Sequence, residues 1–340
     1  MSVLYPIFRS ALFLVEPERA HRLALEALRL SGRLPARQVT DAGVELMGLK
    51  FPNRVGLAAG FDKNADAVDG LGRVGFGFLE IGTVTPRPQS GQMMPRLFRL
   101  RRYRSLVNRM GFPSDGAAAV AARLRLRRYS GIVGVSIGKN ADTPLGRAVD
   151  DYSVCLRTLH AVADYIAVNI SSPNTTALRD LHEPEQLESL LRDLLAERNT
   201  LAGSGGRRLP LLLKVSPDLD SVSLEAVARV ARAVSLDGII ATNTTVRRDG
   251  ISPDRPPLAG GLSGPPLRPL SLATVTILRR LLGPQFPLIG VGGIDSPEAA
   301  VAMRSAGADL VQLFTGLVYE GPSLPVRCAR ALAARGEEIN

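Results

Sequence analysis

Eight short apolar runs, separated by amphipathic segments, constrain the fold of this chain more than any other feature. The runs are nearly continuous rather than alternating, which is typical of parallel strands covered on both faces. They lie at residues 55–59, 78–83, 132–138, 165–171, 210–215, 238–242, 287–292 and 309–315. Segments with helical spacing lie between them, at 114–128, 150–162, 184–197, 221–234, 269–282 and 296–306. This alternation predicts an α/β fold, a (β/α)8 TIM barrel; a doubly wound sheet is the alternative, but eight regular repeats favour closure.

The first 40 residues stand outside this alternation. One apolar stripe at helical spacing runs through residues 4–15, Glu16-Pro17 interrupts it, and a second stripe runs through residues 20–28. We therefore predict two domains, an N-terminal amphipathic helical hairpin over residues 1–40 and a barrel over residues 41–340. The hairpin has wide apolar faces and a basic polar side. It either closes one end of the barrel or lies on a membrane surface, and the two roles are compatible.

The composition fits a globular protein with a large core, since 45% of the residues are hydrophobic and 22% are charged. No apolar run approaches the roughly 18 residues of a membrane-spanning helix, and the N-terminus lacks the pattern of a secretory signal. We therefore expect an intracellular protein without a transmembrane helix. Two distant cysteines and three histidines form no metal-ligand spacing, so we expect no metal site.

An excess of arginine gives the chain a formal net charge of +10 and a pI near 10.3. The arginines cluster at residues 96–104 and 123–129. Such clusters are either a solvated basic face or a surface that attracts nucleic acid or anionic lipid. An aromatic fraction of only 5%, with no tryptophan and no recognisable RNA- or DNA-binding motif, argues against nucleic acid.

Asparagine, threonine and lysine recur where the predicted strands end, which is where a barrel of this kind builds its active site. These positions are Lys63, Thr83, 169–174, Lys214, 242–244 and the glycine-rich ends of the last two strands. Histidines and paired carboxylates do not recur there, which argues against hydrolysis by either. Converging asparagines can read a pyrimidine ring, because each offers a carbonyl acceptor and an amide donor. Lysines near the centre and a glycine-rich phosphate pocket favour FMN as the cofactor.

The ordered motifs at these strand ends resemble those of the dihydroorotate dehydrogenase family. They are AAGFDKNA, IGTVTPRPQSG, NRMGF, IGKN, VNISSPNT, LLKVSPD, ATNTT, GGLSG and GVGGI, spread over nearly the whole chain. The hairpin sequence EPERAHRLAL resembles the class-two, membrane-associated, quinone-reducing branch. So does the serine after the fourth strand, where the class-one branch has cysteine.

The resemblance implies a dihydroorotate dehydrogenase (quinone) that oxidises dihydroorotate to orotate in de novo pyrimidine biosynthesis. Ser172 would remove the C5 proton, the C6 hydride would pass to N5 of one non-covalent FMN, and a membrane quinone would reoxidise the flavin. The chain would be a monomer, held peripherally on the anionic cytoplasmic side of the cell membrane. An FMN barrel enzyme acting on a related dihydropyrimidine with fumarate or NAD as acceptor is the alternative.

The resemblance also assigns residues, position by position. Dihydroorotate would contact Lys63, Asn108, Arg109, Met110, Gly111, Phe112, Asn169, Asn174, Asn243 and Thr244. FMN would contact Ala59, Gly60, Phe61, Asp62, Lys63, Thr83, Ser136, Asn169, Lys214, Thr242, Gly264, Gly293, Phe314 and Thr315. Quinone would contact His21 and Arg99.

Two positions depart from the family pattern. Ser136 stands where the class-two pattern has asparagine, and its shorter hydroxyl could lose or relay a hydrogen bond to the flavin. Phe314 stands where many members have tyrosine. Phosphate binding by backbone N–H groups survives that change, whereas a tyrosine hydroxyl reaching toward the quinone is lost.

Overall fold

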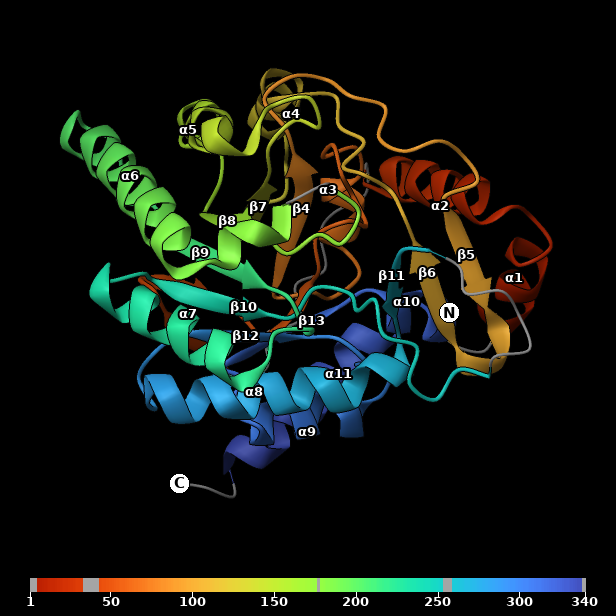
Figure 1. Ribbon diagram of the computed structural model, residues 1–340. Coiled ribbons are helices and arrows are strands. Elements are labelled where there is room, and N and C mark those ends of the chain that lie inside the picture. The colour runs from red at the N-terminus through yellow and green to blue at the C-terminus, as the bar shows by residue number, and fades with distance from the viewer. Residues whose placement is uncertain (1–4, 33–42, 176–177, 253–258, 338–340) are drawn as a thin grey trace.

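The eight predicted strands are buried on both faces and close into one parallel barrel. The computed structural model describes residues 5–32, 43–175, 178–252 and 259–337. Around the barrel the strands follow in the order β10, β12, β13, β3, β4, β7, β8, β9 (Figure 1). Their bounds are β3 Val55–Leu57, β4 Phe78–Val84, β7 Ile132–Ile137, β8 Tyr165–Asn169, β9 Leu211–Val215, β10 Gly238–Ala241, β12 Leu288–Val291 and β13 Leu310–Leu313. The predicted (β/α)8 barrel is confirmed; the doubly wound alternative is wrong, because β13 pairs with β3 and closes the sheet.

Helices surround the barrel, and capping side chains fix where several of them begin. Ser296 Oγ accepts a hydrogen bond from Ala299 N (3.2 Å), and Pro297 occupies the first position of the helix, as the sequence predicts. Asp220 caps another helix through Ser223 N (2.8 Å). The helices are α3 Val68–Leu71, α4 Ala117–Arg125, α5 Ala148–Leu159, α6 Pro184–Gly203, α7 Ser221–Ala233, α8 Arg268–Leu282, α9 Pro297–Ser305, α10 Thr315–Glu320 and α11 Leu324–Glu337. The six predicted helices correspond to α4 to α9.

Two antiparallel sheets of short strands, three or four residues each, lie outside the eight predicted runs. A hairpin covers the N-terminal end of the barrel, where Phe51 packs edge-on against Phe78 with ring centroids 5.2 Å apart. In the second sheet the strand order is β11, β6, β5, and its central strand β6 ends at Asn108. The five strands are β1 Val44–Leu46, β2 Leu49–Phe51, β5 Leu97–Leu100, β6 Ser105–Asn108 and β11 Gly261–Ser263.

The N-terminal segment forms two helices, α1 Tyr5–Leu12 and α2 Pro17–Ser31, as the apolar stripes predict. The Glu16 carboxylate caps α2 by accepting hydrogen bonds from Glu18 N (3.0 Å) and Arg19 N (2.8 Å). In Figure 1 both helices lie beside β5 and β6. The predicted boundary between residues 40 and 41 falls outside the described residues and stays a prediction. In the part of the chain that the structure describes, no helix has the length and apolarity to cross a membrane.

Three aspartates, each one residue before a strand, tie together the N-terminal ends of neighbouring strands. Each carboxylate accepts a hydrogen bond from a backbone N–H of the adjacent strand and pairs with an arginine. The trios are Asp164 with Val133 and Arg127, Asp237 with Leu211 and Arg198, and Asp309 with Leu288 and Arg279. The central pair is the most buried of the three, since the side chains of Arg198 and Asp237 are 4% and 9% exposed and lie 2.6 Å apart.

We expect Asp237→Ala to lower the free energy of unfolding by about 3–5 kcal/mol, because it leaves the buried Arg198 guanidinium without the carboxylate that balances its charge. Glu188→Ala is the matched control: it removes the exposed partner of Arg192 on α6, a pair worth at most about 1 kcal/mol. Denaturant unfolding of both variants measures the difference. Equal losses would contradict a special role for the buried pair.

Candidate active site

One cavity of about 460 Å³ lies at the C-terminal ends of the barrel strands and continues between α1, α2 and the sheet formed by β5 and β6. The strands are parallel, so the residues after them converge on this end. The lining includes most residues that the sequence singles out. They are Lys63, Asn108, Met110, Gly111, Phe112, Asn169, Ser172, Asn174, Asn243 and Thr244; Ala59, Gly60, Phe61, Thr83, Lys214, Thr242, Gly264, Gly293, Phe314 and Thr315; and His21 and Arg99.

Asp62, Ser136 and Arg109 are not among the lining residues. The Asp62 carboxylate turns to its own loop and accepts hydrogen bonds from Asp66 N (2.9 Å) and Ala67 N (2.8 Å). Ser136 is fully buried behind Thr83, with the two hydroxyl oxygens 2.9 Å apart. The guanidinium of Arg109 donates to Pro95 O (2.9 Å) outside the cavity. Asp62 and Arg109 therefore stabilise the backbone of nearby loops, and Ser136 contacts a cavity-lining residue, Thr83, without lining the cavity itself.

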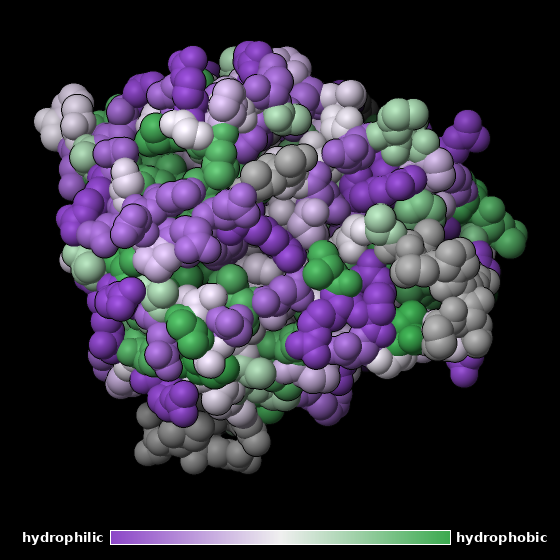
Figure 2. All heavy atoms as spheres, viewed as in Figure 1, coloured by the Kyte–Doolittle hydropathy of each residue, from purple (hydrophilic) through white to green (hydrophobic). Residues whose placement is uncertain are grey.

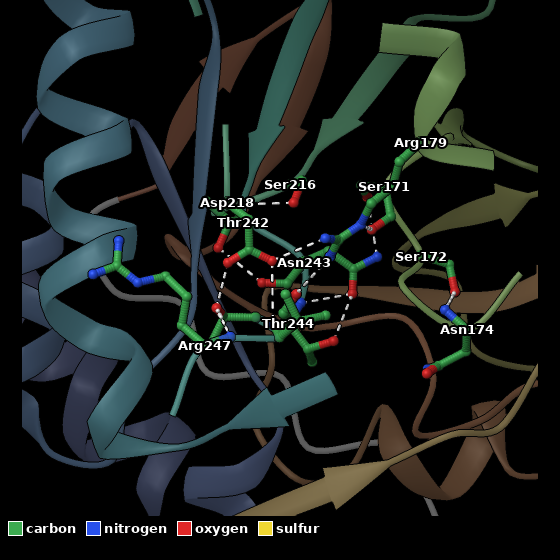
Figure 3. A network of polar contacts seen from close by, with 12 residues as sticks. Ser171, Ser172, Asn174, Arg179, Ser216, Asp218, Thr242, Asn243, Thr244 and Arg247 are labelled. Atoms are coloured by element: carbon green, nitrogen blue, oxygen red, sulfur yellow. Dashed lines mark hydrogen bonds and ion pairs between the residues drawn. The ribbon is translucent and has the colours of Figure 1, made fainter. Parts of the chain in front are cut away.

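Amide side chains from β8 and from the loop after β10 form one network, of which Figure 3 labels Ser171, Asn243 and Thr244. Asn169 Nδ2 donates to Thr83 Oγ1 (2.9 Å), and Asn169 Oδ1 accepts from Ser171 Oγ (3.1 Å) and Asn243 Nδ2 (3.3 Å). Asn243 Oδ1 accepts from Thr244 N (2.7 Å). These partners fix which end of each amide donates and which accepts. The wall of the cavity is therefore an ordered array of donors and acceptors.

Ser172 lines the cavity and is only 5% exposed. Its Oγ accepts a hydrogen bond from Asn174 N (3.3 Å), a contact visible in Figure 3. Asn174 Nδ2 donates to Asn108 Oδ1 (3.2 Å), and Asn108 Nδ2 donates to Gly261 O (3.3 Å). The antiparallel sheet thus brings Asn108 to the loop after β8. Sequence reasoning places both asparagines at one site but not in contact.

Lys63 supplies a cationic group at this end of the cavity. Its Nζ donates to Gly60 O (2.7 Å). Burial lowers the pKa of Lys63 to about 8, while the nearby Glu18 carboxylate opposes that shift. Glu18 is itself held by Arg96, at 2.7 Å, and this hydrogen bond lowers the pKa of Glu18. A helix of the N-terminal hairpin therefore contributes to the charge balance around Lys63.

A buried carboxylate beneath the cavity escapes the sequence reasoning. Glu80, on β4, is fully buried and contacts Lys214 Nζ at 3.3 Å. Its other oxygen accepts hydrogen bonds from Tyr165 Oη (2.9 Å) and Gln312 Nε2 (2.8 Å). Burial and the Glu80 charge raise the pKa of Tyr165 well above its usual value. The sequence does contain a signal for this carboxylate, because Glu80 is an acidic residue within an otherwise apolar predicted strand.

Gln312, which lines the cavity, also has one buried polar side-chain atom without a partner among the described residues. Its Nε2 is committed to Glu80, which can only accept, so its Oε1 is the free end. This Oε1 is buried and has no hydrogen-bond partner among the described residues, while Gln312 lines the cavity. A buried acceptor of this kind normally has a partner. A bound group with a hydrogen-bond donor would satisfy it.

Glycines shape the end of the cavity near β11 and β13. Gly264 has φ +98° and Gly293 has φ +74°, a backbone region that side chains disfavour. A Cβ on Gly264 would lie 2.8 Å from Arg104 O, and one on Gly293 would lie 2.5 Å from Arg268 Cβ. Close by, Ser263 Oγ and Thr315 Oγ1 are 2.7 Å apart. Backbone that lines the cavity without side chains, next to two hydroxyls, suits the binding of a phosphate group.

The other end of the cavity is apolar and lies against α1 and α2. His21 packs edge-on against Phe61, with ring centroids 4.9 Å apart, and burial lowers the pKa of His21 to about 4. His21 is therefore neutral at pH 7. Arg99 Nη1 donates to Val15 O (2.7 Å), and its guanidinium lies over the Phe13 ring. The apolar lining residues include Leu12, Ala20, Ala24, Ala27, Leu28, Leu97, Leu106 and Leu317.

Comparison with known proteins agrees with this geometry. A family model described as dihydroorotate dehydrogenase matches residues 42–335. A dihydroorotate dehydrogenase (quinone) from Aromatoleum aromaticum is 50% identical over 332 residues, covering 97% of this chain and 95% of the relative. One from Cellvibrio japonicus is 47% identical, covering 97% and 98%. The crystal structure of DHODH in complex with ferulenol from Eimeria tenella superposes with a TM-score of 0.88 at 36% identity, covering 95% of this chain and 92% of the other. The chain belongs to the dihydroorotate dehydrogenase family, as its strand-end motifs predict.

Proposed function

We propose that this protein is a dihydroorotate dehydrogenase (quinone), EC 1.3.5.2, which oxidises dihydroorotate to orotate in pyrimidine biosynthesis with FMN and a quinone. The observation that carries the proposal is a single cavity with two chemically different ends. One end is lined by asparagines, Ser172 and Lys63, and the other is lined by apolar residues of the N-terminal hairpin. A polar, anionic substrate and an apolar acceptor can therefore reach opposite ends of one site.

The residues between these ends fit FMN. When bound, FMN takes two electrons from the substrate and passes them to the quinone. The cavity-lining backbone at Gly264 and Gly293, together with Thr315, would hold its phosphate. Lys214 would supply a positive charge next to the flavin, and Gln312 Oε1 offers an acceptor that a hydrogen-bond donor of FMN would satisfy.

Ser172 is the base in this proposal, and its Oγ receives the proton from C5 of dihydroorotate. To accept this proton, Ser172 must be present as the alkoxide, which then becomes the neutral hydroxyl. Hydrogen-bond donors stabilise a serine alkoxide and so make this form accessible. The N–H of Asn174, at 3.3 Å from Ser172 Oγ, is one such donor. Asn108, Asn169, Asn174 and Asn243 would orient the pyrimidine ring, and the protonated Lys63 would attract the substrate carboxylate.

The hairpin would rest on the anionic cytoplasmic face of a membrane as a peripheral part of a monomer. Figure 2 shows hydrophobic surface at the edge of the molecule where α1 lies. Exposed apolar side chains of the hairpin are Ile7, Phe8, Leu14, Leu23 and Leu30. Arginines of the same helices, such as Arg22 and Arg29, are exposed and would add attraction to anionic lipid.

An anaerobic visible spectrum of the purified protein tests the function. We expect flavin bands that bleach on addition of dihydroorotate and recover with a soluble quinone, but not with fumarate or NAD. Recovery with fumarate or NAD would favour the alternative acceptor. A flavin that ignores dihydroorotate would overturn the substrate.

Substitution of the base sharpens the same experiment. We expect Ser172→Ala to slow the bleaching by dihydroorotate about 10²–10⁴-fold, the usual contribution of a general base, with the flavin content unchanged. Ser204→Ala, at the exposed end of α6, is the matched control and should leave the rate unchanged. A rate in Ser172→Ala close to that of the control would exclude Ser172 as the base.

Orotate binding should depend on pH through Lys63. Only the protonated lysine attracts the carboxylate, and its pKa of about 8 means that this charge is lost as the pH rises through 8. Orotate affinity should therefore be flat from pH 6 to 7 and fall about tenfold per pH unit above 8. Lys63→Met should bind more weakly at pH 7 and lose this dependence, whereas substitution of the exposed Lys50 of β2, Lys50→Met, should keep it. Titration of the flavin spectrum with orotate gives the affinities, and an unchanged profile in Lys63→Met would contradict the assignment.

Membrane binding should depend on the exposed apolar residues of the hairpin. We expect Phe8→Ser and Leu14→Ser to reduce sedimentation with anionic vesicles, because both side chains are exposed, at 61% and 85%. Leu126→Ser is the control, since Leu126 is 82% exposed but lies at the end of α4. Equal binding of the unmodified protein to anionic and neutral vesicles would disprove the electrostatic contribution.

A further inference from the structure

Arg179 lies outside the cavity and connects two of the loops that build it with the loop after β9. The residue is in a short 3-10 helix, Leu178–His182, beyond the serine-rich loop after β8. Its Nε donates to Ser171 O (3.4 Å), its Nη2 donates to Thr244 O (3.4 Å) and its Nη1 pairs with Asp218 Oδ2 (3.0 Å). One guanidinium thus contacts the loops after β8, β9 and β10 (Figure 3).

Asp218 completes the connection from the loop after β9. Its Oδ1 accepts a hydrogen bond from Thr245 Oγ1, and its Oδ2 accepts one from Val246 N (3.0 Å). Its own N–H donates to Ser216 Oγ (3.2 Å). Asp218 is therefore fixed to its own loop and to the segment that follows Asn243 and Thr244.

We propose that Arg179 and Asp218 are a positioning pair that holds the Ser172 loop in register with Asn243 and Thr244, so that base and substrate meet at reacting distance. The proposal rests on the function proposed above. Ser171 O, which accepts from Arg179, belongs to the peptide group that joins Ser171 to Ser172. Thr244 O belongs to a residue whose backbone N–H is held by Asn243. The pair therefore acts on the backbone at both sides of the substrate pocket.

The chemistry of the two side chains supports positioning rather than stability as their main role. The side chains are 27% and 13% exposed, and their partners lie in the loops after β8, β9 and β10 rather than in the barrel strands, so the pair orders the loops that carry the site. Three fixed N–H directions in one plane can hold three loops at once, which a lysine ammonium does not reproduce. A displacement of about 1 Å between reacting groups can cost 10²-fold in rate. Small loop shifts should therefore change the chemistry before they change the fold.

Separate measurement of the two half-reactions tests the proposal. In Arg179→Lys and Asp218→Asn holoenzyme, we expect the limiting rate of flavin reduction at saturating dihydroorotate to fall about 10–100-fold. The rate at which quinone reoxidises chemically reduced enzyme should stay unchanged, as should the flavin content. Arg192→Lys and Glu188→Gln, which alter an exposed ion pair on α6, are the matched controls and should change neither rate.

Each other outcome is decisive. The positioning role would be overturned if the variants reduced the flavin at a limiting rate within twofold of the unmodified enzyme. It would also be overturned if only the dihydroorotate concentration for half-maximal rate changed, or if both half-reactions slowed equally. If the ion-pair variants fail to fold, Thr245→Val removes only the hydroxyl that donates to Asp218. It should slow reduction several-fold without slowing reoxidation, and an unchanged reduction rate would overturn the proposal. Failure of dihydroorotate to reduce the unmodified enzyme would instead overturn the proposed function, and the positioning role with it.

Discussion

Closure of the barrel is the constraint on which the rest of the structure depends. Because β13 pairs with β3, all eight strands have partners on both sides and all point the same way. Residues separated by more than 200 positions, such as Lys63 and Phe314, therefore line one cavity. The aspartates before β8, β10 and β13 stabilise the opposite end, so stability and chemistry are divided between the two ends of the barrel.

Closure also creates a low-dielectric interior in which a charge needs complete compensation. Glu80 and Lys214 meet directly above a layer of apolar side chains that includes Leu212, Ile240 and Leu310. A buried ion pair is tolerated when its remaining hydrogen-bonding capacity is satisfied, and Tyr165 and Gln312 provide that for Glu80. The result is a fixed lysine facing the cavity from below. Its position is set by the barrel itself and not by a flexible loop.

The sequence predicted the long-range architecture better than the local supports of the site. Eight nearly continuous apolar runs sufficed for the barrel, since burial on both faces leaves a strong pattern. The short strands β5, β6 and β11 lie outside those runs, and in β5 Arg99 interrupts the apolar sequence. Most residues at the strand ends line the cavity as expected, whereas Arg109 and Asp62 turn away because nearby backbone groups satisfy them. Arg179 and Asp218 could not be paired from sequence, because two separate loops bring them together.

The two departures from the family pattern agree with the polarity of the regions they occupy. Ser136 lies on the polar side, where its hydroxyl meets Thr83, and Thr83 in turn accepts from Asn169. Ser136 is therefore linked to the cavity by a hydrogen bond to the Thr83 hydroxyl. Phe314 lies where polar and apolar ends meet and packs edge-on against Phe61, with ring centroids 5.6 Å apart. Phe61 contacts the neutral His21, so three rings form a continuous wall toward the hairpin. A tyrosine hydroxyl is unnecessary for that wall, since the packing of the ring faces and edges holds it together.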